Sequence, residues 1–237
     1  MIRILLWDID GTVLNFLEAE KAAIRCGFRR FAMGECTDEM LERYSAINRR
    51  YWEALERGEM TKPEILVGRF REFFRNEGLN ADLAEDFNAH YQVDLGDTVC
   101  FCDKADKLLP ELGKRYKQYA VTNGTAVAQH KKLKLSGLEE ILDGWFISDE
   151  LGSEKPTRAF FDIAFRKIEE DMGSFTGDEV LLIGDSLTSD MRGGENAGVR
   201  TCWYNPEGKE NNLGVRVDRE IRDLNELPAY LEQLNAQ

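Results

Sequence analysis

The sequence predicts an α/β fold: a doubly wound, Rossmann-like parallel sheet with an inserted all-helical cap. Three observations point to this fold. Short apolar runs ending in turn residues recur along the chain, amphipathic segments separate them, and one long interval shows helical periodicity without a strand signal. With 237 residues, 43% of them hydrophobic, the chain suits one large domain or two unequal ones.

The predicted strands are dense apolar runs, as expected for strands buried on both faces of a sheet. The first is IRILLW, residues 2–7. The later runs are residues 119–122, 144–148, 179–185 and 199–204. Amphipathic segments predict helices between them, over residues 104–115, 125–135 and 157–171. Strand followed by helix, repeated, favours right-handed crossovers and therefore a parallel sheet.

The interval that follows the first strand breaks this alternation. Apolar residues recur there at helical spacing, for example Phe70, Phe73 and Phe74. They predict four helices, over about residues 17–33, 38–57, 61–77 and 82–94. We expect a core formed by residues 1–16 and 99–237 and a helical cap formed by residues 17–98. An ordinary helical subdomain would show the same pattern, but a segment placed here could also cover whatever the first strand presents.

The charge of the chain limits its partners. A net charge of −13, from 31 basic and 44 acidic residues, argues against nucleic-acid polymers and anionic membranes as partners. No apolar run approaches the ~18 residues of a membrane span, and the first run is too short for a signal peptide. The five cysteines are odd in number and scattered, which favours reduced thiols and a cytoplasmic protein.

Two carboxylates stand at the end of the first predicted strand. Asp8 and Asp10 are two residues apart, so both side chains can face the same cleft. In open parallel sheets, ligands bind beyond the carboxyl ends of the strands, near the point where strand order reverses. A solvated turn or a helix cap would also explain this pair taken alone.

Polar residues also follow the later strands. Thr122 and Asn123 precede a helix whose exposed N–H groups could bind phosphate, although a simple turn would use the same residues. Lys155 precedes a proline, and a lone lysine is usually a solvated surface charge. Asp185 and Asp190 follow the fourth run, where a turn and a capped helix are the ordinary explanation.

A doubly wound sheet could bring four of these carboxylates, Asp8, Asp10, Asp185 and Asp190, to one mouth. Two like charges 4 Å apart cost about 4 kcal/mol at an effective dielectric of 20. One Lys155 cannot offset four carboxylates, so we expect either protonation or a bound cation. An all-oxygen ligand set suits Mg²⁺.

The motifs DIDGT, TNG, EKP and GDSLTSD, in this order, resemble the four motifs of the haloacid dehalogenase superfamily, and residues 17–98 are similar to its type-1 cap. The resemblance implies that Asp8 is a nucleophile that forms an aspartyl-phosphate. Asp10 would protonate the leaving oxygen and then accept a proton from water. Thr122 and the Asn123 backbone would bind phosphoryl oxygens, and Lys155 would span Asp8 and the phosphate.

The resemblance also implies the cofactor and the branch of the superfamily. Mg²⁺ would be held by the Asp8 carboxylate, the Asp10 main-chain carbonyl and Asp185, with Asp190 as a ligand or a support. An aspartate at position 10 fits phosphatases and phosphomutases, whereas haloacid dehalogenases and phosphonatases lack this acid. A binding module that had lost turnover would be expected to lack the nucleophile or the acid.

The substrate is suggested by residues 45–61, 68–70 and 201–205, which are similar to bacterial pyrimidine 5'-nucleotidases of the noncanonical-nucleotide type. This resemblance implies a Mg²⁺-dependent phosphomonoester hydrolase acting on (deoxy)pyrimidine nucleoside monophosphates such as dUMP, UMP and dTMP. A phosphatase for phosphoglycolate or a sugar phosphate, and a phosphomutase, remain alternatives. We expect a monomer or homodimer whose partner is a small phosphate monoester.

Aromatic residues of the cap could offer a face on which a base stacks. The candidates are Tyr44, Tyr51, Trp52 and Phe70. Core packing of a small helical bundle would explain most of them equally well. Arg69 could contact the substrate or could be a solvated surface arginine.

Overall fold

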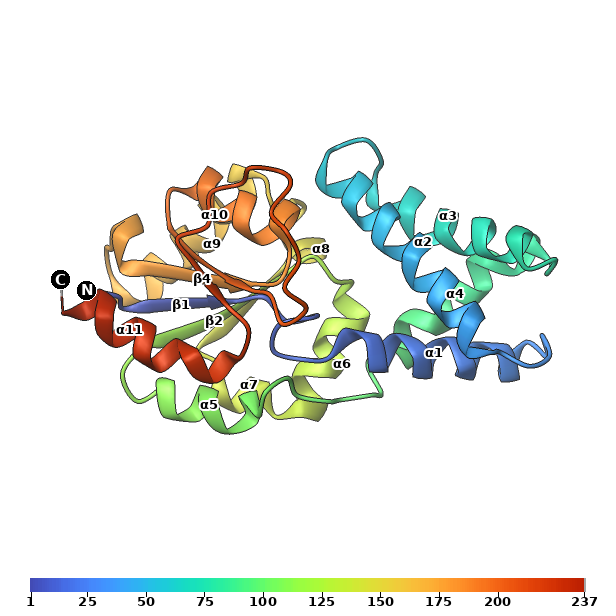
Figure 1. Ribbon diagram of the computed structural model, residues 1–237, viewed down its shortest axis with the longest axis horizontal. Helices are drawn as coiled ribbons and strands as arrows, with labels where there is room; N and C mark the ends of the chain where they lie inside the picture. The colour runs from blue at the N-terminus through green and yellow to red at the C-terminus, as the bar shows by residue number, and fades with distance from the viewer. Residues whose placement is uncertain (237) are drawn as a thin grey trace.

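The computed structural model describes residues 1–236 and contains a six-stranded sheet with helices on both faces (Figure 1). The strands are β1 (Ile4–Trp7), β2 (Lys117–Thr122), β3 (Gly144–Ile147), β4 (Val180–Gly184), β5 (Arg200–Tyr204) and β6 (Arg219–Ile221). Every strand pair is parallel, in the order β3-β2-β1-β4-β5-β6. The predicted doubly wound sheet is confirmed. Strand β6 was not predicted, because Ile221 is its only buried residue and it forms no apolar run.

Strand β1 lies in the middle of the sheet, between β2 and β4. Ile4 is in register with Lys117 on one side and with Val180 on the other. Strand order reverses beside β1, so its carboxyl end lies at the topological switch point where ligands bind in open α/β sheets.

The side chains of β1 alternate between two apolar layers. Leu5 and Trp7 belong to the layer that also contains α5 and α11, whereas Ile4 and Leu6 pack with α9. Burial on both faces explains why the first run is apolar without interruption. In Figure 1, α9 and α10 lie above the sheet and α5, α7 and α11 lie below it. The core helices are α5 (Ala105–Leu112), α6 (Ala126–Ser136), α7 (Leu138–Ile141), α8 (Ser148–Leu151), α9 (Arg158–Met172), α10 (Arg192–Ala197) and α11 (Leu227–Asn235).

Four helices that follow β1 in the chain form the group on the right of Figure 1. They are α1 (Phe16–Arg30), α2 (Asp38–Glu56), α3 (Lys62–Asn76) and α4 (Ala84–Asp94), close to the predicted ranges. The side-chain oxygens of Asn15 and Thr37 accept hydrogen bonds from N–H groups in the first turns of α1 and α2, which satisfies otherwise unpaired donors. We call this group the cap. Its limits at residues 17 and 98 stay a prediction.

The cap has its own aromatic core. Tyr44 and Phe70 are fully buried and stacked, with ring centroids 5.0 Å apart, and Phe87 packs against Phe70 at 4.9 Å. Two of the four predicted base-stacking candidates, Tyr44 and Phe70, are therefore core residues and have no free face for a ligand.

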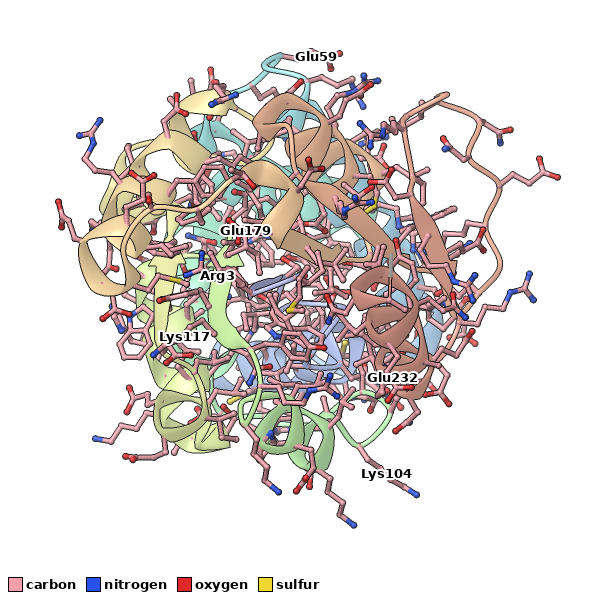
Figure 2. The ribbon with its side chains drawn as sticks, turned by 90° about the vertical axis from the view of Figure 1, so that its left-hand side faces the viewer. Arg3, Glu59, Lys104, Lys117, Glu179 and Glu232 are labelled. Carbon is pink, nitrogen blue, oxygen red and sulfur yellow. The ribbon has the colours of Figure 1, made fainter. Side chains whose placement is uncertain are left out.

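The amino ends of the strands form the surface opposite the cap. Figure 2 shows this end, with Arg3, Lys117 and Glu179 at the outside of the sheet. The guanidinium of Arg3 pairs with Glu179 at 3.2 Å, with both side chains partly exposed. Charged groups at this end are thus solvated, unlike those at the carboxyl ends. Within residues 1–236, no helix combines the length and the apolar character needed to cross a membrane.

Candidate active site

A cleft of about 700 Å³ separates the cap from the carboxyl ends of β1, β2 and β4. The core wall carries the predicted site residues Asp8, Asp10, Thr122, Asn123, Lys155, Asp185 and Asp190. The cap wall is formed largely by α2, including Asn48 and Trp52. The structure therefore brings all the predicted site residues to a single mouth.

Asp8 lies one residue beyond β1, and its N–H still continues the sheet by donating to Ile183 O at 2.9 Å. Its carboxylate is buried. Oδ1 accepts a hydrogen bond from Lys155 Nζ at 2.8 Å, whereas Oδ2 has no hydrogen-bond partner within residues 1–236. Burial raises the pKa of Asp8 to about 7: Lys155 opposes this rise and Asp190 adds to it. Asp8 thus has one oxygen held in place and one free.

Lys155 lies at the centre of the site and is only 1% exposed. Its ammonium donates to Asp8 Oδ1 at 2.8 Å, Asp190 Oδ1 at 2.6 Å and Val121 O at 2.7 Å, which uses all three donors. Burial lowers the pKa of Lys155, but Asp190 and Asp8 raise it by more, so the net shift is upward. Lys155 is therefore a buried cation and not a solvated surface lysine.

Asn123 holds Lys155 in position. Its side-chain amide donates to Lys155 O and accepts from Lys155 N–H, both at 2.8 Å. The Asn123 side chain is therefore occupied, which leaves its backbone for a ligand.

Thr122 is 1% exposed and lies beside Asn123 on the wall of the cleft. Its Oγ1 accepts from Gly124 N–H at 3.0 Å. This bond is the local turn contact that the sequence analysis allowed, and the N-cap of α6 is a different residue, Thr125.

Asp8, Asp185 and Asp190 form an acidic cluster: one carboxylate oxygen from each of them lies within 4.8 Å of the other two. Both Asp190 oxygens are hydrogen-bonded, to Lys155 and to Ser186 N–H. Within residues 1–236, the carboxylate of Asp185 accepts only one long hydrogen bond, of 3.5 Å, from Thr12 Oγ1. Burial, with Asp8 and Asp190 adding to it, raises the pKa of Asp185 well above its usual range.

Two glycines leave room for this cluster. A Cβ on Gly11 would lie 2.7 Å from Asp185 Oδ2, and the φ of Gly11 is +101°, which disfavours other residues. A Cβ on Gly184 would lie 2.2 Å from the Asp190 carboxyl group. The glycines in DIDGT and IGDS therefore let the backbone approach the carboxylates closely.

The acidic cluster fits a divalent cation. Two buried carboxylates, Asp8 and Asp190, pair with one ammonium, and the half-buried Asp185 lies beside them. Within residues 1–236, Asp8 Oδ2 is buried without a hydrogen-bond partner. Carboxylate oxygens are the ligands that Mg²⁺ prefers, and a buried charge is costly unless it is paired. Asp8, Asp185 and Asp190 could hold such an ion.

We expected four carboxylates to lie together, but the carboxylate of Asp10 lies outside the acidic cluster. Oδ2 accepts from Gln129 Nε2 at 2.6 Å, and Oδ1 forms an ion pair with Lys132. The structure thus gathers three carboxylates, whereas the fourth is held by two donors from α6.

Gln129 and Lys132 were not identified from the sequence. They are three residues apart on the buried face of α6, a helix for which we expected an apolar face. The sequence did contain one indication of their role, because two polar residues occupy positions of this helix that face the core.

The cap contributes residues of three kinds. Trp52 is half-buried and lines the cleft. Arg69 is 1% exposed and donates to Asn48 Oδ1 at 2.6 Å, so the prediction of a solvated arginine is wrong. Glu56, which the sequence analysis missed, ends α2 and accepts a hydrogen bond from Thr188 of the core. Burial raises the pKa of Glu56 to about 8.

Comparison with known proteins agrees with this geometry. The family model described as haloacid dehalogenase-like hydrolase matches residues 5–204. The chain is 36% identical to a protein of Bacillus subtilis named as the HAD-hydrolase YfnB, over 95% of this chain and 93% of the relative. A crystal structure of YfnB bound to magnesium superposes with a TM-score of 0.90, covering 97% of this chain and 98% of that one.

The names of two further relatives state a substrate class. Pyrimidine 5'-nucleotidase PynA of Streptococcus pneumoniae is 33% identical, over 98% of this chain and 95% of the relative. Pyrimidine 5'-nucleotidase YjjG of Escherichia coli is 30% identical, over 82% of this chain and 84% of the relative.

Proposed function

The chain belongs to the haloacid dehalogenase-like hydrolases, and from this premise we propose that it is a Mg²⁺-dependent 5'-nucleotidase for pyrimidine nucleoside monophosphates. The observation that carries the proposal is the buried Asp8, which lines the cleft within a cluster suited to a cation and has one carboxylate oxygen without a partner among residues 1–236. Asp10 stands two residues away, within the same cleft.

The substrate class is supported by the relatives and by the cleft. PynA and YjjG are named as pyrimidine 5'-nucleotidases. A cleft of about 700 Å³ is large enough for a nucleotide, and Trp52 offers an aromatic surface on the cap side.

In the first step that we propose, the Asp8 carboxylate attacks phosphorus. The bond from phosphorus to the leaving oxygen breaks, and Asp10 gives that oxygen a proton. An aspartyl-phosphate and a free nucleoside result. Lys155 reduces the repulsion between the Asp8 carboxylate and the phosphate dianion, and Thr122 with the Asn123 backbone binds phosphoryl oxygens.

In the second step, water attacks the phosphorus of the aspartyl-phosphate and Asp10 accepts its proton. The bond between Asp8 and phosphorus breaks, which releases phosphate and restores both aspartates. When bound, Mg²⁺ supplies positive charge that favours the ionised form of Asp8 and offsets the charge of the phosphoryl group.

A panel of monophosphates tests the substrate class. We expect phosphate release to be fastest with dUMP, UMP and dTMP, and slower with AMP, phosphoglycolate and glucose phosphates. Faster turnover of phosphoglycolate or a sugar phosphate would overturn the nucleotidase proposal, and isomerisation without phosphate release would indicate a phosphomutase.

The Asp8→Asn variant tests the nucleophile. We expect it to lose at least about 10³-fold in kcat, because the amide cannot form the acyl phosphate. Acid quenching with ³²P-labelled substrate should label wild-type protein on Asp8 and leave the variant unlabelled. Unchanged activity in a folded Asp8→Asn variant would contradict the mechanism.

A further inference from the structure

The Asp10 carboxylate is bound by two side chains that lie outside the four sequence motifs described above. Gln129 donates to Oδ2 at 2.6 Å, and Lys132 forms an ion pair through Oδ1. Both donors are buried, Gln129 at 0% and Lys132 at 1% exposure. Each oxygen of Asp10 is thus held by a different donor from α6.

Lys132 has little other reason to be buried. Within residues 1–236, Asp10 is its only carboxylate partner within 4 Å. Burying an ammonium is costly unless it is paired, so the fold requires this ion pair, unlike an incidental contact between surface charges.

Lys132 also contacts the start of the cap. Its ammonium lies 5.5 Å from the ring centroid of Phe16, the first residue of α1, in cation–π geometry. The ammonium therefore lies between the Asp10 carboxylate and the point where the chain enters the cap, and both Asp10 and Phe16 line the cleft.

We propose that Lys132, assisted by Gln129, is a positioning residue that fixes the Asp10 carboxylate for proton transfer to and from the substrate. This inference rests on the proposed function, because it assumes that Asp10 is the acid and base. An ionised carboxylate offers about four lone-pair sites, so one donor on each oxygen leaves sites free for the proton in transfer.

The consequence concerns the leaving group. An alkoxide leaving group, such as the 5'-oxygen of a nucleoside, needs a proton as it departs, whereas p-nitrophenolate departs without one. Misplacing Asp10 should therefore slow formation of the aspartyl-phosphate from a nucleotide far more than from p-nitrophenyl phosphate. The value of kcat/KM reports this first step, whereas the second step, in which Asp10 is the base, is the same for both substrates. A merely structural role for Lys132 would slow both substrates alike.

The experiment compares Lys132→Met with wild type on dUMP and on p-nitrophenyl phosphate. We expect kcat/KM for dUMP to fall about 100-fold and kcat/KM for p-nitrophenyl phosphate to fall only a few-fold. Asp10→Asn should show the same dependence on the leaving group. The Lys132→Met/Asp10→Asn double variant should be no slower than Asp10→Asn alone, because both changes act on the same proton transfer.

The matched control is Lys134→Met, the same substitution at an exposed position of α6. It should leave both rates close to wild type. If Lys132→Met does not fold, Gln129→Met removes one donor without leaving a buried charge, and should show the same dependence with a smaller size.

Equal slowing of both substrates, or no slowing, in a folded Lys132→Met or Gln129→Met variant would overturn this inference. Its failure is distinguishable from failure of the proposed function. If Asp10→Asn keeps its dependence on the leaving group while the α6 variants lack it, only the positioning role is wrong. If Asp8→Asn is fully active, the proposed function itself is wrong.

Discussion

Two polar clusters line opposite walls of the same cleft, and they differ in how far their charged groups are paired or hydrogen-bonded within the protein. In the cap, Glu20 accepts from Ser45 and from Asn48 Nδ2, and Asn48 in turn accepts from Arg69. One carboxylate and one guanidinium balance each other through Asn48, and Arg69 makes a further bond to Asn88. The charged groups of this cluster are paired or hydrogen-bonded by the protein itself.

The core cluster is not balanced in this way. Asp8 and Asp190 share one ammonium, that of Lys155, and Asp185 lies beside them without an ion pair within the described residues. Asp8 Oδ2 has no hydrogen-bond partner there either. Buried polar groups are normally satisfied, so an unsatisfied group in a cleft is a candidate for ligand binding. The comparison indicates that the cap cluster stabilises the fold, whereas the core cluster binds a ligand.

The largest effect on stability that we predict is in the cap. Arg69→Met should lower the free energy of unfolding by about 3–5 kcal/mol, because it leaves the oxygens of Asn48 and Asn88 without this donor and removes positive charge near the buried Glu20. Urea denaturation measures this loss. Arg71→Met, at an exposed position of α3, is the control and should stay within about 0.5 kcal/mol of wild type. An equal, small effect in both variants would mean that the cap cluster does not depend on its charge balance.

A smaller effect, on selectivity, is predicted at Trp52. Trp52→Ala should lower kcat/KM for dUMP about tenfold and leave phosphoglycolate almost unaffected, because stacking on a base contributes about 1–3 kcal/mol. Tyr51→Ala is the control, since Tyr51 is hydrogen-bonded to Glu72 at 3.1 Å within the cap. If Trp52→Ala lowered kcat/KM equally for dUMP and phosphoglycolate, Trp52 would not contribute to recognition of the base.

A pH-dependent effect on stability is predicted at Glu56, where the cap meets the core. Its pKa in the folded protein is raised from 4.5 to about 8, so the stabilising contribution of its neutral form is fully present below pH 4.5 and is lost as the pH rises through about 8. The Tm of wild type should therefore fall relative to that of Glu56→Gln between pH 5 and 9, by about 2–4 °C for each kcal/mol lost. Thermal unfolding in EDTA measures this difference. A difference in Tm that stays constant across this range would contradict the assignment.

The apolar pattern was sufficient to predict much of the fold. Buried strands such as Ile4–Trp7 and the cap helices have strong periodic signals, and their observed limits lie within a few residues of the predicted ones. Strand β6 was missed because strands with exposed residues, such as Arg219, carry no such signal. Short helices such as α8 were missed because four residues contain too little periodicity.

The site was predictable where a residue follows a strand directly. Asp8, Thr122 and Asp185 stand at strand ends, so the topology alone brings them together. Gln129 and Lys132 lie within a helix, and their contact with Asp10 depends on how α6 packs, which local sequence does not encode. The position of the Asp10 carboxylate, outside the acidic cluster, could not be predicted for the same reason.

The most direct test of the difference between the two clusters is a Mg²⁺ titration of stability at constant ionic strength, in wild type and in Asp185→Asn. If the core cluster is completed by the ion, the unfolding free energy of wild type should rise by about 2.7 kcal/mol at a Mg²⁺ concentration 100 times the Kd. Asp185→Asn should show little rise, and without Mg²⁺ it should be at least as stable as wild type, because an amide replaces one of the three clustered carboxyl groups. An equal rise in both proteins, or none in wild type, would contradict the account.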